Sequence, residues 1–155
     1  DEWLVANFGD YEELPLKSIA KGDLEDLDSK EDKKKKEKTA KDFEKVINKV
    51  QKILENQVKE VKVSSRLSES PSCLIADENE MGSNMERIMK SLGQDVPETK
   101  PILEINPKHP LVKKLKTKVD KDLVKVLFDQ AVLSEGGQIK EPAEFVKRMN
   151  KLMLG

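Results

Sequence analysis

The sequence has little of what active sites are usually built from. It contains one histidine, His109, and one cysteine, Cys73, so neither a zinc site with several His and Cys ligands nor an internal disulfide is expected. His109 lies at a predicted helix start, where capping is its simplest role, and Cys73 lies in an apolar run, where a buried thiol is the simplest interpretation. Glycine-rich phosphate-binding motifs and the G-x-S-x-G motif are absent. We therefore expect no catalytic residue, metal site or cofactor site, and no enzyme, in this chain.

Long apolar runs and an excess of one charge are also missing. No run of apolar residues approaches the ~18 that indicate a membrane-spanning helix. The 29 basic residues nearly balance the 30 acidic ones. This balance argues against general binding to nucleic acid or to membranes. The basic run 33–38 could bind nucleic acid, but the acidic residues at 23–32 would cancel much of its positive field. Nucleic-acid binding is therefore only a minor alternative. Without a signal-peptide pattern, and with a start at Asp1 rather than Met, we expect a piece of a longer cytoplasmic protein.

The pattern of apolar residues predicts an α+β fold for residues 29–155. An amphipathic helix ending near Gln57 carries an apolar stripe of Phe43, Val46, Ile47, Val50, Ile53 and Leu54. Short strands are predicted at 61–67, 73–76 and 102–105, and further helices at 82–92, 110–115, 120–135 and 142–155. Residues 1–28, with a short helix, a turn at Gly9-Asp10, a short strand and an acidic linker, are too few for a core. They are expected to be the tail of a preceding domain.

The last two helices are unusually apolar. In the first, apolar residues cover nearly the whole circumference: Leu123, Val124, Val126, Leu127, Phe128, Ala131, Val132 and Leu133. The second carries an apolar stripe of Phe145, Val146, Met149, Leu152 and Met153. A helix that is apolar on all sides must be buried on all sides. Either a large core within one chain or a bundle between two copies would satisfy this requirement.

The helix predicted at 82–92 presents a second unusual surface. Its apolar positions are Met81, Met85, Ile88, Met89 and Leu92, of which three are methionine. Packing against the chain's own sheet is one interpretation. An exposed binding face is the other, because flexible methionine side chains adapt to unlike partners.

Five short motifs resemble the C-terminal domain of the ninety-kilodalton heat-shock chaperones. They are Ser65-Arg66-Leu67, Ser70-Pro71, the run from Asn84 to Lys90, the run from Leu103 to Pro107, and the run from Asp129 to Leu133. Residues 1–19 are similar to the end of that family's middle domain. The resemblance covers essentially the whole chain, and the motifs occur in the family's order.

The resemblance implies a homodimer held by a four-helix bundle from the last two long helices of each subunit. The interface residues it implies are Leu123, Val124, Leu127, Phe128, Ala131, Phe145, Met149 and Leu152. It also implies that ATP and magnesium bind in an N-terminal domain that this chain does not include. Dimerisation would then raise the local concentration of the two ATPase domains, so that they close as a clamp.

The resemblance further implies contact with partly folded client proteins. The client-binding residues it suggests are Trp3, Asn7, Met81, Met85, Ile88 and Met89. The chain ends Lys151-Leu152-Met153-Leu154-Gly155, without the tail motifs of the eukaryotic cytosolic or reticulum members, and so resembles the bacterial type. The alternative is a structural oligomerisation module that makes no client contact of its own.

Overall fold

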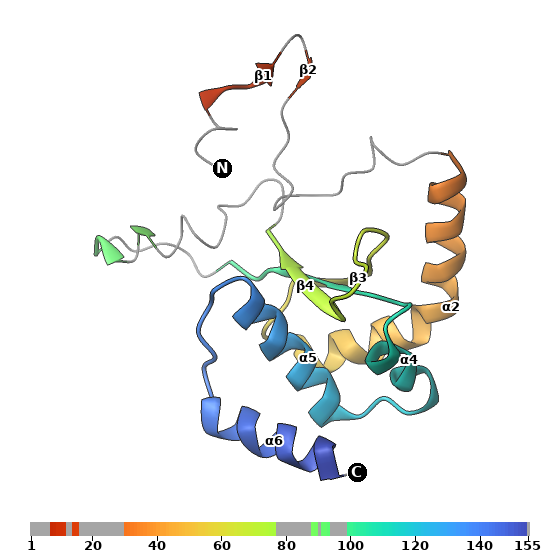
Figure 1. Cartoon of the computed structure of the whole chain (residues 1–155), viewed down its shortest axis with the longest axis vertical. Helices are drawn as coiled ribbons and strands as arrows, with labels where there is room; N and C mark the ends of the chain where they lie inside the picture. The colour runs from red at the N-terminus through yellow and green to blue at the C-terminus, as the bar shows by residue number, and fades with distance from the viewer. Residues whose placement is uncertain are drawn as a thin grey trace.

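The computed structural model describes residues 7–11, 14–15, 30–76, 88–89, 91–93 and 99–154. The predicted client residues Trp3, Met81 and Met85 lie outside the described residues. Within them, a three-stranded sheet is combined with four helices, which confirms the predicted α+β class (Figure 1). A separate two-stranded hairpin of β1 (Asp10–Tyr11) and β2 (Leu14–Pro15) precedes them.

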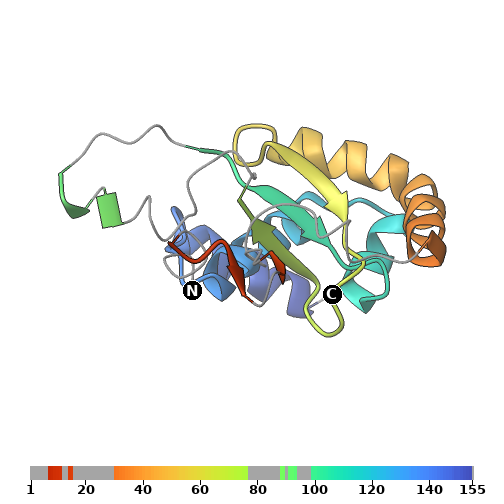
Figure 2. The same cartoon turned by 90° about the horizontal axis from the view of Figure 1, so that it is seen from above.

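The sheet has its last strand in the middle. Its order is β3-β5-β4, where β3 is Glu60–Val63, β4 is Ser72–Ile75 and β5 is Ile102–Ile105. The central strand β5 runs parallel to β3 and antiparallel to β4, and Figure 2 shows the three strands side by side. The sheet is therefore mixed, and β5 exchanges backbone hydrogen bonds with both neighbours.

One prediction of strand length was wrong. The alternating pattern of residues 61–67 predicts a strand to Leu67, but β3 ends at Val63. The Ser64 hydroxyl accepts hydrogen bonds from the backbone N–H groups of Arg66 and Leu67, each at 3.3 Å, and so turns the chain away from the sheet. Serine side chains commonly redirect the backbone in this way, and periodicity alone does not reveal it.

Helices α4, α5 and α6 begin within one residue of their predicted starts. Helix α4 (Pro110–Thr117) is capped by His109, whose Nδ1 accepts from the Leu111 N–H at 3.2 Å. Helix α5 (Lys121–Ser134) is capped by Asp120, which accepts from two backbone N–H groups, and Gly136 follows its end with φ of 73°. Helix α6 (Pro142–Leu154) opens on the predicted proline. The capping role predicted for His109 is thus confirmed.

The core lies between one face of the sheet and the helices. Helix α2 (Lys30–Leu54) ends three residues before the predicted Gln57. Four residues of its predicted stripe are buried and Ile47 and Ile53 are partly buried, and the stripe packs with Val61, Val63, Leu103 and Ile105 of the sheet. Helices α4 and α5 complete the same cluster through Val112, Leu115, Leu123, Val124, Leu127, Phe128 and Ala131. The Ser72 hydroxyl, at the start of β4, donates a hydrogen bond of 2.9 Å to the Leu127 carbonyl. Helix α6 packs on α5 at the end of the chain (Figure 1).

Candidate interaction surfaces

Helix α5 lies inside the single chain. All five of its predicted interface side chains are less than a tenth exposed: Leu123, Val124, Leu127, Phe128 and Ala131. They are covered by α2, by the sheet and by α6 of the same chain. Of the two interpretations that the sequence left open, the intramolecular core therefore accounts for these five positions. The apolar surface that remains open to a partner comes from other residues.

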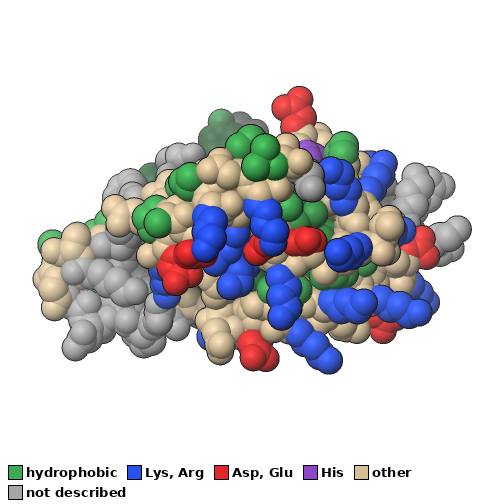
Figure 3. Space-filling model, turned by 90° about the horizontal axis from the view of Figure 1, so that it is seen from below, with side chains coloured by type: hydrophobic (Ala, Val, Ile, Leu, Met, Phe, Trp, Pro, Cys, Tyr) green, Lys and Arg blue, Asp and Glu red, His purple; other side chains and the backbone are tan. Residues whose placement is uncertain are grey.

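Helix α6 supplies most of this open surface. None of its described side chains is buried, and Val146, Met153 and Leu154 are 54%, 69% and 89% exposed. Of its three predicted interface residues, Phe145, Met149 and Leu152 are half-buried, and Leu152 packs against the core. Leu133, near the end of α5, is also half exposed. Figure 3 views this side of the molecule and shows hydrophobic side chains exposed among lysines and arginines.

The described part of the predicted client surface is also exposed. Of the predicted client residues, Ile88 is 51% exposed, Asn7 is exposed and Met89 is half-buried, and Leu92 of the same predicted helix is 69% exposed. The Leu92 N–H donates to the carbonyls of Ile88 and Met89, and Gly93 follows with φ of 75°. The predicted end of this helix near residue 92 is therefore confirmed, and the side chains of Ile88 and Leu92 face solvent.

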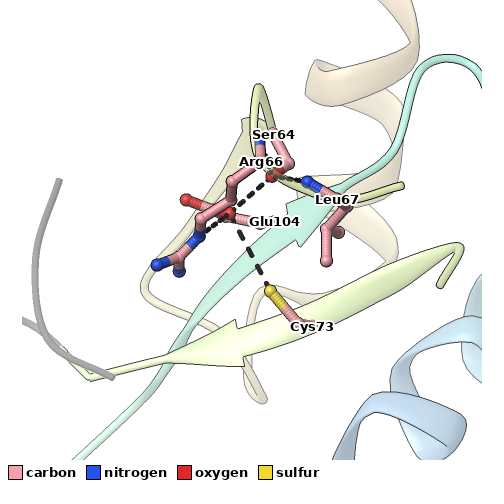
Figure 4. Close-up of polar contacts among 5 residues, drawn as sticks. All are labelled: Ser64, Arg66, Leu67, Cys73 and Glu104. Carbon is pink, nitrogen blue, oxygen red and sulfur yellow. Dashed lines mark hydrogen bonds and ion pairs between the residues drawn. The ribbon is translucent and has the colours of Figure 1, made fainter. Parts of the chain in front are cut away.

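The family motifs at Ser65-Leu67, Ser70-Pro71 and Leu103–Pro107 meet at the end of the central strand. The buried Glu104 carboxylate accepts hydrogen bonds from the Ser64 hydroxyl at 2.8 Å and from Arg66 Nε at 3.0 Å (Figure 4). Two residues further on, the Asn106 amide donates to the carbonyls of Ser68 and Ser70 at 3.2 and 3.1 Å. Together these contacts fix the loop between β3 and β4, so these motifs have a structural role.

The Glu104 carboxylate also accepts a hydrogen bond from Cys73 on the adjacent strand, with 3.8 Å between Cys73 Sγ and Glu104 Oε2 (Figure 4). Burial, and then the negative charge of Glu104, raises the pKa of the Cys73 thiol to about 11. The side chain is half-buried rather than a full core residue, but at neutral pH it is a protonated, weakly nucleophilic thiol. This agrees with the unreactive role predicted for it.

Alkylation should reveal the raised pKa of Cys73. Its rate of reaction with iodoacetamide should still rise about tenfold per pH unit between pH 9 and 10, because only the thiolate reacts. In the urea-unfolded chain, burial and the charge of Glu104 no longer raise the pKa of the thiol. The reaction rate should therefore stop rising once the pH exceeds the thiol's ordinary pKa of 9.0. A rate that levels below pH 9 in the folded chain would contradict the assignment.

Within the described residues, no group of three or more His, Cys, Asp or Glu side chains is placed to hold a metal ion. Over those same ranges, no helix has the length and apolarity needed to cross a membrane. The polar side chains that sequence reasoning missed are Glu104, Asp129 and Arg148. Glu104 and Asp129 lie within two of the family motifs, but the motifs do not show that Glu104 faces Arg66 or that Asp129 faces Arg148.

The family model described as Hsp90 protein matches residues 1–155. The chain is 79% identical over 153 residues to the Chaperone protein HtpG of Ruthia magnifica subsp. Calyptogena magnifica, and 77% identical to that of Vesicomyosocius okutanii subsp. Calyptogena okutanii. It is 51% identical over 158 residues to the Chaperone protein HtpG of Nitrosomonas europaea. Each alignment covers 99% of this chain but 25% of the relative, so the chain spans about a quarter of their length. The chain belongs to the Hsp90 protein family, in the type represented by the bacterial HtpG chaperones.

Proposed function

We propose that this chain is the part of an HtpG-type chaperone that pairs two subunits and contributes to the contact with client proteins. Residues 29–155 form the dimerisation domain, and residues 1–28 are the end of a middle domain and a linker. ATP and magnesium bind elsewhere in the full-length protein, and the chain itself carries no catalytic residue. The observation that carries the proposal is the apolar surface of α6, which is exposed to solvent in the single chain.

The proposed interface is a symmetric bundle of α5 and α6 from two copies. Val146, Met149 and Met153 follow one another at i, i+3 and i+7 and so form one stripe along α6. Phe145 and Leu152 lie beside this stripe on α6, and the buried residues of α5 support it from inside the subunit. Burying each large apolar side chain contributes roughly 1.5–3 kcal/mol before association costs, so the combined stripes of two copies support a stable dimer.

Negative charges introduced into the apolar stripe of α6 should separate the two subunits. The double variant Val146→Asp with Met153→Asp places a carboxylate at two exposed positions, so the fold and its circular dichroism should be unchanged. In sedimentation velocity the unmodified chain should be a dimer at micromolar concentration, and the variant a monomer.

The control adds two carboxylates at exposed positions of other helices, Thr117→Asp on α4 and Asn48→Asp on α2. This control should remain dimeric, because its charges lie off the stripe. An unmodified chain that stays monomeric at high micromolar concentration would remove the proposal of dimerisation.

The client surface is proposed on Met81, Met85, Ile88 and Met89, with Trp3 and Asn7 contributing. Two paired variants test it, Met81→Ser with Met85→Ser and Ile88→Ser with Leu92→Ser. Both should weaken binding of a fluorescently labelled, permanently unfolded protein, measured by anisotropy. The second pair replaces side chains that are more than half exposed, so the thermal midpoint should change little.

The exposed Lys113→Ser on α4 serves as the control and should bind the unfolded protein as the unmodified chain does. Unchanged binding by both paired variants would favour the alternative, an oligomerisation module without client contact. A large fall in the thermal midpoint, as for a core deletion, would instead assign these side chains to packing.

A further inference from the structure

A cavity of about 270 Å³ lies where the end of α2, strand β4, helix α5 and the loop between α5 and α6 meet. Its volume is just below the ~300–1,000 Å³ of cavities for drug-sized ligands, so its occupant is small, on the scale of one amino acid. Leu74, Phe128, Val132 and Ile139 supply an apolar lining. The cavity thus offers an apolar compartment large enough for one side chain.

Two charged side chains in its wall are strongly buried without the usual hydrogen bonds. The side chains of Asp129 and Arg148 are 12% and 13% exposed, and their closest atoms lie 3.8 Å apart. Arg148 reaches Glu141 and Glu144 only at 3.9 Å, and neither Asp129 nor Arg148 makes a side-chain hydrogen bond within the described part of the chain. Their polar atoms still reach solvent, so a carboxylate and a guanidinium open onto the cavity with hydrogen-bonding capacity left for a ligand.

The remaining charges of the wall carry both signs. Lys100, Lys125 and Lys140 line the cavity together with Arg148, and Glu141 lines it together with Asp129. The Lys100 ammonium already donates a hydrogen bond to the Glu55 carbonyl at 3.1 Å. A ligand with only a carboxylate would satisfy the cations but approach the two acids unfavourably. A ligand with only an ammonium group would satisfy the two acids but be repelled by the cations. A small ligand that carries both charges suits the wall best.

We propose that this cavity binds a free apolar α-amino acid in its zwitterionic form. Asp129 and Glu141 accept hydrogen bonds from the ammonium group, and Arg148 and Lys125 donate to the carboxylate. The side chain of the amino acid packs against the apolar lining around Phe128. Charge-assisted hydrogen bonds of both signs make this recognition specific for the free amino acid over a peptide end.

The cavity is separate from the proposed dimer stripe. Successive residues of a helix are about 100° apart, so Val146 and Met153, the two residues changed in the dimer test, lie about 160° and 140° around α6 from Arg148. Loss of dimerisation and loss of amino-acid binding are therefore distinct results, and the inference does not rest on the proposed function.

The test is a titration of the ¹⁵N-labelled chain with three compounds, followed by two-dimensional NMR. The compounds are L-leucine, L-leucinamide, which lacks the carboxylate, and N-acetyl-L-leucine, which lacks the ammonium group. Leucine should cause saturable shifts of the amide signals of Phe128, Val132 and Ile139. The other two should bind about tenfold more weakly, because each loses one set of charge-assisted hydrogen bonds.

Variants assign the effect to the cavity. Asp129→Asn should weaken leucine binding about tenfold and remove the preference for leucine over N-acetyl-leucine. The matched control is Glu144→Gln, which also removes a carboxylate 3.9 Å from Arg148 but does not line the cavity, and it should bind leucine as before. Arg148→Lys provides a second variant, in which the preference for leucine over leucinamide should fall.

Three results would overturn the proposal. Absence of saturable shifts with leucine would exclude an amino-acid site. Equal binding of all three compounds would indicate simple apolar partitioning. Tighter binding of N-acetyl-leucine than of leucine would instead assign the cavity to the C-terminal carboxylate of a peptide.

Discussion

Leu127→Glu is expected to unfold the chain rather than to produce a folded monomer. Leu127 is 2% exposed and lies in the core between the sheet and the helices. Removing a buried leucine side chain costs roughly 2–5 kcal/mol, and an unpaired carboxylate in its place costs several more. Because single domains are stable by only about 5–15 kcal/mol, the sum approaches the total free energy of folding.

Circular dichroism and urea denaturation measure this effect. Leu127→Ala should remain folded with its free energy of unfolding lowered by about 3 kcal/mol. The control Leu133→Glu makes the same change six residues later on α5, where the side chain is half exposed, and should keep a cooperative unfolding transition. If Leu127→Glu is folded and monomeric, then Leu127 faces a second subunit instead of its own core.

The roles of the two C-terminal helices show where sequence reasoning stops. The all-round apolar pattern of α5 correctly predicts burial, but periodicity does not say which surfaces provide the cover. In the structure, β4, α2 and α6 of the same chain cover α5. Helix α6 is amphipathic and its apolar side is covered only in part, so its exposed Val146 and Met153 could not be distinguished from core residues by spacing alone. Exposure depends on tertiary packing, which the pattern of one helix does not contain.

Helix boundaries were predictable because their signals are local. Asp120, His109 and Pro142 each act on backbone groups within a few residues, and the structure confirms all three starts. The polar contacts of Glu104 were not predictable in the same way, because Arg66 and Ser64 lie 38 and 40 residues away in sequence. The pairing of Asp129 with Arg148 likewise depends on how α6 packs on α5. Long-range contacts of this kind follow from the fold and leave no spacing signal.

Glu104→Ala is expected to have the second large effect on stability. The substitution removes the acceptor for the Ser64 hydroxyl and for Arg66 Nε, and it leaves both groups in place beside the sheet. Breaking a buried ion pair from one side costs ~3–5 kcal/mol, and since the Arg66 side chain is still 29% exposed to solvent, we expect about 2–3 kcal/mol. Urea denaturation should show this loss as a lower midpoint with an unchanged slope.

Two companion variants separate the role of Glu104 from a general loss of charge. Glu69→Ala removes an exposed carboxylate from the loop between β3 and β4 and should leave the free energy of unfolding nearly unchanged. Glu104→Gln keeps the size of the side chain but removes the negative charge that raises the pKa of Cys73. The pKa of Cys73 should therefore fall toward its ordinary value, and alkylation at pH 9 should become faster. If Glu104→Ala costs no more than Glu69→Ala, the loop is held by Asn106 and the backbone without help from the carboxylate.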